Sequence, residues 1–300
     1  MPRWPAGHPA LTDGGRTYHV SYRELGRVGR LGNALYEFAA TVGTAFRLGG
    51  VPQFNADWTH RPYFDVPDGL FADDFGALES CTEVTELVPE IDLRERHYLQ
   101  HFSLFNDAVT MLTLRRMLQP TVAATEILNE QREAFDALPR PILSVHVRRG
   151  DNVQINDPDT PNKHLYHPMP TQNYYRNATD HALFHAETPP ASVAVFSDDP
   201  DWCEEHLPGH DYYHRGVVRP KEHEPDFLTA PVLDWIDWQL IRACDLHVCS
   251  NSTFSLMAAI MSGNPTVVPH PFFGPKLDYI DPGNMYPSDW VRLHNETGEP

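Results

Sequence analysis

The hexapeptide His-Val-Arg-Arg-Gly-Asp, residues 146–151, contains the residue types with the clearest chemical potential. Apolar and β-branched residues that follow Pro141 predict a short buried strand over residues 142–147. Arg148 and Arg149 come at the carboxyl end of this strand, where planar guanidinium groups can bind phosphate or carboxylate in a bidentate manner. The hexapeptide therefore predicts an anion site. The alternative is an ion pair of Arg148 or Arg149 with an acid of this acidic chain.

Two further predicted strands end in polar clusters. The strand over 191–196 ends at Ser197-Asp198-Asp199, and the strand over 246–249 ends at Ser250-Asn251-Ser252-Thr253, which begins a helix. In a parallel α/β sheet such strand ends meet along one edge, where ligands bind. Guanidinium groups and a helix start favour a diphosphate, and carboxylates favour the hydrogen-bond donors of a base or ribose. Together the clusters predict a nucleoside diphosphate site, whereas each acidic or Ser/Asn cluster alone could serve only as a helix cap.

The second half of the chain alternates predicted strands and helices, which is typical of an α/β fold with a mostly parallel sheet and right-handed crossovers. Helices are expected over 171–185, 201–206, 231–243 (with Trp235, Trp238 and Leu240 inward) and from 253 to 261, and a last strand over 265–269.

The first half begins with a predicted strand over 17–22, a glycine-containing loop over 26–33, a helix over 33–48 and a strand over 51–54. Five apolar side chains at helical spacing are expected to form one buried face of that helix: Leu35, Phe38, Ala39, Val42 and Phe46. The glycines at 26, 29 and 32 do not have the dinucleotide-binding spacing. A tight entry to a packed helix is the favoured interpretation of the loop, although amides at the helix start could face a cleft.

The candidate domain junction is Pro139-Arg140-Pro141, where a predicted helix ends and a new strand begins. Before it we expect a strand over 97–102 and helices over 107–118 and 121–138. We therefore expect a flexible tail over 1–15, an N-terminal domain over 16–140 and a C-terminal domain over 141–300.

Composition excludes several classes of function. The net charge of −18 argues against binding to nucleic acid or anionic membranes, because clustered Lys and Arg dominate such binding. No apolar run approaches the ~20 residues that span a bilayer, so we expect no integral membrane segment and a cytoplasmic protein, with peripheral association at the inner membrane face as an option. The cysteines Cys81, Cys203, Cys244 and Cys249 lack zinc-binding spacing and are expected to be free thiols.

Several motifs, in order along residues 26–292, closely resemble the glycosyltransferases of family 11, the α-1,2-fucosyltransferases. They are Gly29–Asn33, Glu37-Phe38-Ala39, His146–Asp151, Phe196–Cys203, Cys249–Ser255 with Ala258-Ala259, and Tyr286–Trp290.

The resemblance implies an α/β, GT-B-like fold of two facing Rossmann-like domains with a cleft between them. The N-terminal domain over 16–140 would then lie on the acceptor side, and the C-terminal domain over 141–300 would bind the GDP-fucose donor. It also implies an inverting transfer of L-fucose from GDP-β-L-fucose to the 2-hydroxyl of a galactoside-containing oligosaccharide, without a metal ion or other cofactor.

Roles follow from the same resemblance, position by position. Arg148 would hold the donor diphosphate with support from Arg149, and His146 and one of Asp198 and Asp199 would contact the nucleoside. The remaining donor-binding residues would lie at the helix start, namely Asn251, Ser252, Thr253 and Phe254. Gly29, Arg30, Gly32 and Asn33 would face the cleft from the other domain.

The catalytic base has several candidates. Asp151 is the first, Asp157 and His146 are rivals, and a structural role for Asp151 in bracing an arginine is equally consistent with the sequence.

The chain departs from the family pattern at Ala34, Asn152 and Leu256-Met257, which leaves the acceptor preference open. Two alternatives therefore remain: a fucosyltransferase of other regiospecificity, α-1,6 or O-linked, and a non-catalytic protein that binds a nucleotide sugar or glycan.

Overall fold

The computed structural model describes residues 19–27, 29–73, 79–80, 90–92, 99–150, 166–214, 230–277 and 284–300. It divides into two compact units, Met1–Ile127 and Leu128–Pro300. The expected tail over 1–15 lies outside the described residues. The expected junction at Pro139–Pro141 lies in the second unit, between α4 (Glu133–Asp136) and β6 (Ile142–Val147).

In the first unit a parallel sheet has the strand order β3-β2-β1-β5-β4 over the described residues. Its strands are β1 (His19–Tyr22), β2 (Val51–Asn55), β3 (Phe71–Ala72), β4 (Glu79–Ser80) and β5 (Glu90–Asp92). Its helical elements are α1 (Leu31–Leu48), η1 (Arg61–Tyr63), η2 (Asp68–Leu70), η4 (Phe102–Leu104) and α2 (Ala108–Met117), and α3 (Val122–Gln131) crosses the division between the units. The first strand–helix–strand segment agrees with the sequence-based expectation.

Helix α1 buries Leu35, Phe38, Ala39 and Val42 completely, which confirms four of the five expected positions, and the burial extends to nearly all of its sides. Thr41 and Glu37 are fully buried, whereas Phe46, expected in the core, is only partly buried. The Thr41 hydroxyl donates to the Glu37 carbonyl at 2.7 Å, which lets a polar residue sit in the core. At Gly43 an added Cβ would lie 2.1 Å from the Leu104 carbonyl oxygen, so this helix and η4 approach each other at backbone distance.

The second unit contains a six-stranded sheet over its described residues, in the order β11-β10-β9-β6-β7-β8, and every pairing is parallel. Its other strands are β7 (Ser192–Ser197), β8 (Tyr212–His214), β9 (Leu246–Val248), β10 (Thr266–His270) and β11 (Val291–His294). Its other helical elements are α7 (Gln172–His185), α8 (Pro200–His206), α9 (Ala230–Arg242), α10 (Thr253–Ser262) and η6 (Pro275–Leu277).

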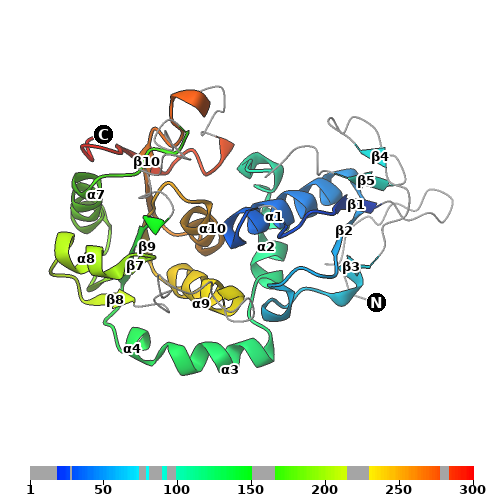
Figure 1. Cartoon of the computed structure of the whole chain (residues 1–300), viewed down its shortest axis with the longest axis horizontal. Helices are drawn as coiled ribbons and strands as arrows, with labels where there is room; N and C mark the ends of the chain where they lie inside the picture. The colour runs from blue at the N-terminus through cyan, green and yellow to red at the C-terminus, as the bar shows by residue number, and fades with distance from the viewer. Residues whose placement is uncertain are drawn as a thin grey trace, which may run out of the picture. The chain divides into compact units, whose positions relative to one another are not determined.

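The strand order is that of a doubly wound nucleotide-binding fold. The chain leaves β6 toward β7 and β8, then returns to β9 on the other side of β6 and continues to β10 and β11. Figure 1 shows α7 and α8 on one side of these strands and α9 and α10 on the other. The direction of winding therefore reverses between β6 and β9, and ligands of such folds bind at the carboxyl edge of that switch point.

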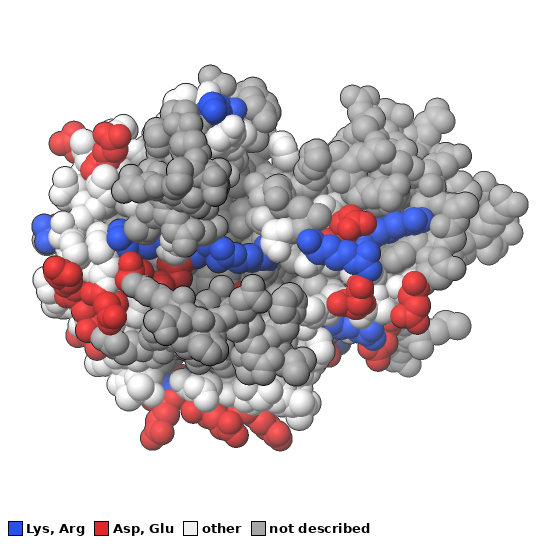
Figure 2. Space-filling model, viewed as in Figure 1, with Lys and Arg blue, Asp and Glu red and all other residues white. Residues whose placement is uncertain are grey.

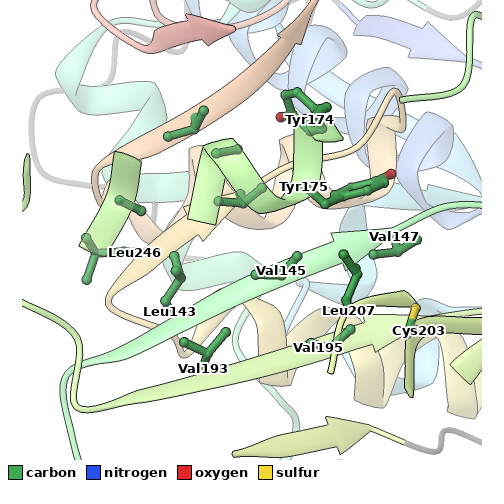
Figure 3. Packing of buried hydrophobic residues seen from close by; sticks show 14 of the residues in the cluster. Leu143, Val145, Val147, Tyr174, Tyr175, Val193, Val195, Cys203, Leu207 and Leu246 are labelled. Atoms are coloured by element: carbon green, nitrogen blue, oxygen red, sulfur yellow. The ribbon is translucent and has the colours of Figure 1, made fainter. Parts of the chain in front are cut away.

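The central strand β6 is buried along its whole length, as expected for a parallel sheet covered on both faces. On one face Leu143, Val145 and Val147 pack against Tyr174 and Tyr175 of α7 (Figure 3). On α9 the tryptophans Trp235 and Trp238 are fully buried, which confirms that they point inward.

Two sequence-based expectations are wrong, and two strands of the second sheet were missed. In place of a strand over 97–102, the described residues 99–101 form no regular element and η4 begins at Phe102. The helix expected over 121–138 is interrupted at Arg132, which separates α3 from α4. Strands β8 and β11 were not expected, because each short segment pairs on only one side at an edge of the sheet and carries little apolar pattern of its own.

Burial of Glu37 predicts a pH-dependent stability. Burial raises the pKa of this carboxyl to about 8, against the opposing effect of the Gly26 N–H, which donates to its Oε2 at 3.4 Å. Because the pKa of Glu37 is higher in the folded state than the unfolded value of 4.5, the protonated carboxyl stabilises the fold. This stabilisation is complete below pH 4.5 and is lost as the pH rises through 8. Glu37→Gln, which cannot ionise, should therefore gain melting temperature relative to wild type between pH 5 and pH 8.

The exposed Glu126 on α3 provides the matched control. Glu126→Gln should show the same difference from wild type at both pH values, measured by thermal unfolding. A pH-independent effect of Glu37→Gln would contradict the assignment.

Candidate functional site

The strand register of the second sheet brings three strand ends together. Val147 of β6 lies opposite Ser197 of β7, and Val145 lies opposite Val248 of β9. One residue further along, Arg148 donates its backbone N–H to the Ser250 hydroxyl at 3.3 Å. The clusters that follow β6, β7 and β9 therefore lie at one edge of the sheet, at its switch point, as the sequence predicts for a ligand site.

Each arginine is paired with the aspartate that the register places beside it. Arg148 forms an ion pair with Asp198, and the Arg149 Nε donates to Asp199 Oδ2 at 3.0 Å. The Arg149 backbone N–H also donates to Asp198 Oδ1 at 2.8 Å. The two arginine side chains are only 16% and 15% exposed, so these contacts orient them. Ion pairing, the alternative considered from sequence, is present at both arginines.

Trp202 of α8 also holds Arg149. The guanidinium carbon lies 4.0 Å from the centroid of the Trp202 ring, a cation–π distance. Asp199 caps the same helix, because its Oδ1 accepts from the Trp202 N–H at 3.3 Å. Sequence reasoning missed Trp202, although its position three residues after an N-capping Asp places it in the first turn beside that Asp. Arg149 is thus fixed by the start of α8.

Gly150 is required by the Arg148–Asp198 pair. Its φ is +20°, and an added Cβ would lie 2.4 Å from Asp198 Oδ2 and 2.7 Å from Arg148 Nη1. Any larger residue would push the two charged groups apart.

The start of α10 lies beside Arg148. Ser252 is the N-cap residue, and its hydroxyl accepts from the Phe254 N–H at 3.3 Å. Thr253 is the first residue of the helix. The backbone amides of a first helical turn together with the helix dipole favour an anion. The Arg148 backbone therefore lies beside the turn that leads into α10, while its guanidinium is paired with Asp198 on the side of β7.

Buried hydrogen bonds brace this edge from below. The Tyr175 hydroxyl donates to the Ser250 hydroxyl at 3.2 Å, and the Tyr174 hydroxyl donates to the Cys249 carbonyl at 2.7 Å. The Asn251 amide donates to the Pro168 carbonyl, while its buried Oδ1 has no partner within the described part of the chain. Helix α7 thus positions the turn that leads into α10.

His146 is neutral in this structure. It lies at the end of β6, 6% exposed, with its ring centroid 5.5 Å from that of Phe254. Burial, reinforced by the positive charge of Arg148, lowers the pKa of the imidazole to about 3. Its Nδ1 is buried with no hydrogen-bond partner among the described residues. An uncharged ring with an unused polar atom suits contact with a polar, uncharged group of a ligand.

The residues expected on the acceptor side lie in the first unit. Gly29 has φ +80° and lies so close to Asn33 that an added Cβ would be 2.2 Å from its Nδ2. Arg30 precedes α1, Gly32 is buried in its first turn, and the Asn33 Oδ1 accepts from Gln100 at 3.0 Å. The loop therefore forms a tight helix entry, the interpretation that the sequence favoured.

Several expected features lie outside the described residues, namely Asp151, Asn152, Asp157 and Cys81. Cys203, Cys244 and Cys249 are free and buried, as expected. Across the described ranges, no cluster of three or more His, Cys, Asp or Glu side chains could hold a metal ion. Over the same ranges no helix has both the length and the apolar character that a membrane span requires.

Figure 2 shows acidic and basic side chains lying directly beside one another on this face of the molecule. On this face the basic side chains therefore lie in clusters of mixed charge, as Arg148 and Arg149 do with Asp198 and Asp199.

Two units with parallel sheets, one of them doubly wound with polar strand ends at its switch point, define an α/β protein of the GT-B type. Among solved structures, a mutant of FUT1 from Arabidopsis thaliana in complex with GDP is similar with a TM-score of 0.51 at 14% identity, over 87% of this chain and 72% of that one. Fucosyltransferase NodZ from Bradyrhizobium is similar with a TM-score of 0.50 at 12% identity, over 81% and 92% of the two chains. These similarities concern the fold.

The model of glycosyl transferase family 11 matches residues 92–294, and the chain belongs to this family. The family resemblance drawn from the motifs is thereby confirmed, and the protein is a glycosyltransferase. The chain is 25% identical over 289 residues to the galactoside 2-alpha-L-fucosyltransferase Sec1 of Mus musculus, covering 91% of this chain and 74% of that protein. It is 24% identical over 286 residues to galactoside alpha-(1,2)-fucosyltransferase 2 of Rattus norvegicus, covering 90% and 76%.

Substitution of Asp199 separates helix capping from ion pairing. Asp199→Asn keeps a capping oxygen and loses the charge that pairs with Arg149, whereas Asp199→Ala loses both. We expect Asp199→Ala to cost about 1 kcal/mol more than Asp199→Asn, the size of a typical N-cap, and Asp199→Asn itself to cost less than about 1 kcal/mol, as for a partly exposed ion pair. Urea unfolding of the three proteins measures both steps. Equal stabilities of the two variants would show that the cap does not stabilise α8.

Proposed function

We propose that the protein transfers L-fucose from GDP-β-L-fucose to the 2-hydroxyl of a galactoside acceptor, with inversion and without a metal ion. The observation that carries this proposal is that the Arg148 backbone N–H donates to Ser250, two residues before the N-cap of α10, so that Arg148 and this helix start belong to the same switch point of the second sheet. Membership of glycosyl transferase family 11 and the α-1,2 relatives support the donor and the linkage.

The departing GDP requires stabilisation of negative charge on its diphosphate. In this proposal Arg148 and the first-turn amides of α10 supply that stabilisation in place of a metal ion. The diphosphate carries more charge than one carboxylate, so it competes with Asp198 for Arg148. Arg148 would then exchange Asp198 for the diphosphate. The released Asp198 carboxylate would accept hydrogen bonds from the nucleoside, which is the role that the family resemblance implies for one of Asp198 and Asp199. Arg149 stays with Asp199 and Trp202 and maintains the shape of the site.

His146 suits nucleoside binding better than proton abstraction. A pKa of about 3 makes it a weak base, because the charged form is disfavoured by burial and by Arg148. Its buried, unpartnered Nδ1 supports a hydrogen bond to the donor nucleotide. The proposal therefore keeps Asp151 as the base that deprotonates the acceptor hydroxyl, with Asp157 as the rival.

Inversion needs a single in-line displacement and no enzyme nucleophile. The acceptor oxygen attacks the anomeric carbon, the bond to the GDP phosphate oxygen breaks, and the base takes the hydroxyl proton. The departures from the family pattern at Ala34, Leu256 and Met257 are fully buried core positions. Because these side chains are buried, their departures change core packing and not contacts with a substrate. They therefore do not favour the alternative of a non-catalytic protein.

Loss of Arg148 tests the diphosphate assignment. Arg148→Ala should lower fucosyl transfer by about 100-fold to 1000-fold, the cost of removing one preorganised donor to developing charge. Arg148→Lys, which keeps the charge beside Asp198 and loses the planar fork, should fall between this variant and wild type. GDP release from GDP-fucose with lactose measures the rates, and circular dichroism checks folding.

The control is Arg176→Ala, since Arg176 is an exposed α7 residue whose guanidinium donates to the His206 carbonyl at 3.3 Å. It should transfer at the wild-type rate. Normal turnover by Arg148→Ala would refute the assignment.

Chelation and product analysis test the remaining parts of the proposal. With lactose as acceptor, GDP release should be unchanged by excess EDTA, because guanidinium and helix amides carry the charge that a metal would otherwise balance. NMR of the product should show an α-1,2 linkage to galactose. An N-acetylglucosamine acceptor fucosylated at O6 would instead favour the α-1,6 alternative. Binding of GDP by calorimetry with no lactose-dependent GDP release would favour a non-catalytic protein.

A further inference from the structure

Two buried hydroxyl groups lie beneath the switch point of the second sheet and have no role in the chemistry of the proposed transfer. Ser250, in the turn between β9 and α10, is fully buried, and Tyr175 of α7 is only 1% exposed. Neither side chain can therefore touch a substrate. Both are nevertheless linked by hydrogen bonds to the backbone of Arg148.

The first of these hydrogen bonds begins where the pairing of two strands ends. The register of β6 with β9 runs as far as Val145 and Val248. Beyond that point the Arg148 N–H donates to a side chain, the Ser250 hydroxyl, at 3.3 Å. The next N–H, that of Arg149, donates to Asp198 Oδ1 at 2.8 Å on the side of β7. The two arginines thus leave the sheet between side-chain acceptors that come from the two neighbouring strand ends.

Tyr175 determines where the Ser250 oxygen lies. A serine hydroxyl can occupy several staggered rotamers, and the strand pairing does not choose among them. The Tyr175 phenol donates to this oxygen at 3.2 Å. Its ring belongs to the same buried cluster as Val147, and Figure 3 shows it extending toward the Val147 end of β6. A donor that is fixed by core packing therefore holds the Ser250 oxygen beside Arg148.

The phenol of Tyr175 stays protonated near neutral pH. Burial raises the pKa of this group above its ordinary value, and the hydrogen bond with Ser250 opposes the shift only in part. The hydrogen bond to Ser250 therefore persists over the pH range in which enzymes are commonly assayed.

Tyr174 provides a contrast in the same helix. Its hydroxyl is equally buried and donates to the Cys249 carbonyl at 2.7 Å. This acceptor is a backbone atom of a residue that the sheet already holds, because the Cys249 N–H donates to the Val267 carbonyl at 2.9 Å. Such an acceptor cannot rotate as a serine hydroxyl does. Only the Tyr175 contact leads through a rotatable group to an arginine.

We propose that Tyr175 is a positioning residue for the donor diphosphate and acts through the Ser250 hydroxyl on the backbone of Arg148. This inference rests on the proposed fucosyl transfer, and it adds two side chains that touch no substrate to those that determine donor affinity. A shift of the Arg148 backbone carries the guanidinium with it. Loss of the Tyr175 hydroxyl should therefore weaken the binding of a diphosphate.

The test is Tyr175→Phe, which removes one hydroxyl and keeps the ring. The Arg148 N–H still has the Ser250 oxygen as an acceptor, so the variant should fold. Calorimetry should show GDP binding weakened about 3-fold to 10-fold, the effect of one hydrogen bond between neutral groups. The kcat/KM for GDP-fucose should fall by a similar factor, while the KM for lactose should stay within about twofold of wild type.

The matched control is Tyr174→Phe, which removes an equally buried hydroxyl from the neighbouring residue and leaves the Cys249 carbonyl without this donor. Urea unfolding should show that it is at least as destabilised as Tyr175→Phe. Its GDP affinity and its kcat/KM for GDP-fucose should nevertheless stay within about twofold of wild type. A merely structural role of Tyr175 would not produce this split between stability and affinity.

Ser250→Ala tests the route from Tyr175 to Arg148. It should weaken GDP binding at least as much as Tyr175→Phe does. Adding Tyr175→Phe to Ser250→Ala should cause no further loss, because the two hydroxyls act on Arg148 in series.

The GDP titrations need no turnover, so they separate this inference from the proposed function. If wild type binds GDP but releases none from GDP-fucose with lactose, the proposed transfer is wrong, and weaker GDP binding by Tyr175→Phe still supports the positioning role. Wild-type GDP affinity in Tyr175→Phe, an equal loss in Tyr174→Phe, or additive losses in the double variant would overturn the inference. Absence of GDP binding by wild type would overturn both.

Discussion

The parallel register between β6 and β7 is the constraint on which the second unit depends. It places two successive arginines beside two successive aspartates, so that each guanidinium finds a carboxylate one strand away. Such pairs at the mouth of a site are weak contributors to stability. Their importance is positional, because they hold two long side chains in one orientation at the edge where the sheet changes its direction of winding. This arrangement requires a glycine at position 150, since a Cβ there would collide with the Arg148–Asp198 pair.

The proposed donor is an anion, whereas the chain is acidic. A net charge of −18 would repel a diphosphate at long range. At the switch point, however, the Arg148 backbone is hydrogen-bonded to Ser250, in the turn that leads into α10. Short-range, partly desolvated interactions of this kind outweigh screened surface charge. The neutral state of His146 follows from the same positive environment, because burial and Arg148 both oppose its protonation.

In the first unit a glycine loop packs against buried side chains. Its glycine loop, the aromatic stack around Trp58 and the buried carboxyl of Glu37 are connected, since Gly26 contacts both Trp58 and Glu37. The Trp58 ring packs on Phe38 and Phe64 and is buried with them, whereas the switch point of the second unit presents guanidinium and helix amides. The two units thus differ in the chemistry they offer, although both are built on parallel sheets with their loops at the carboxyl edge.

The sequence by itself determined the alternation of strands and helices in the second unit, the three polar strand ends and the family. These are local signals: β-branched runs set the strands, and a capping Asp199 or Ser252 marks where a helix starts. Only the tertiary structure decided which carboxylate pairs with which arginine, because that depends on strand register, and that Trp202 lies against Arg149. Tertiary packing also buried α1 on nearly all sides against its one-faced pattern and raised the pKa of Glu37. The cavity of the first unit that Asp57, Trp58 and Arg61 help to line could not be predicted, since its lining comes from segments whose proximity depends on long-range contacts such as Arg27 with Asp57.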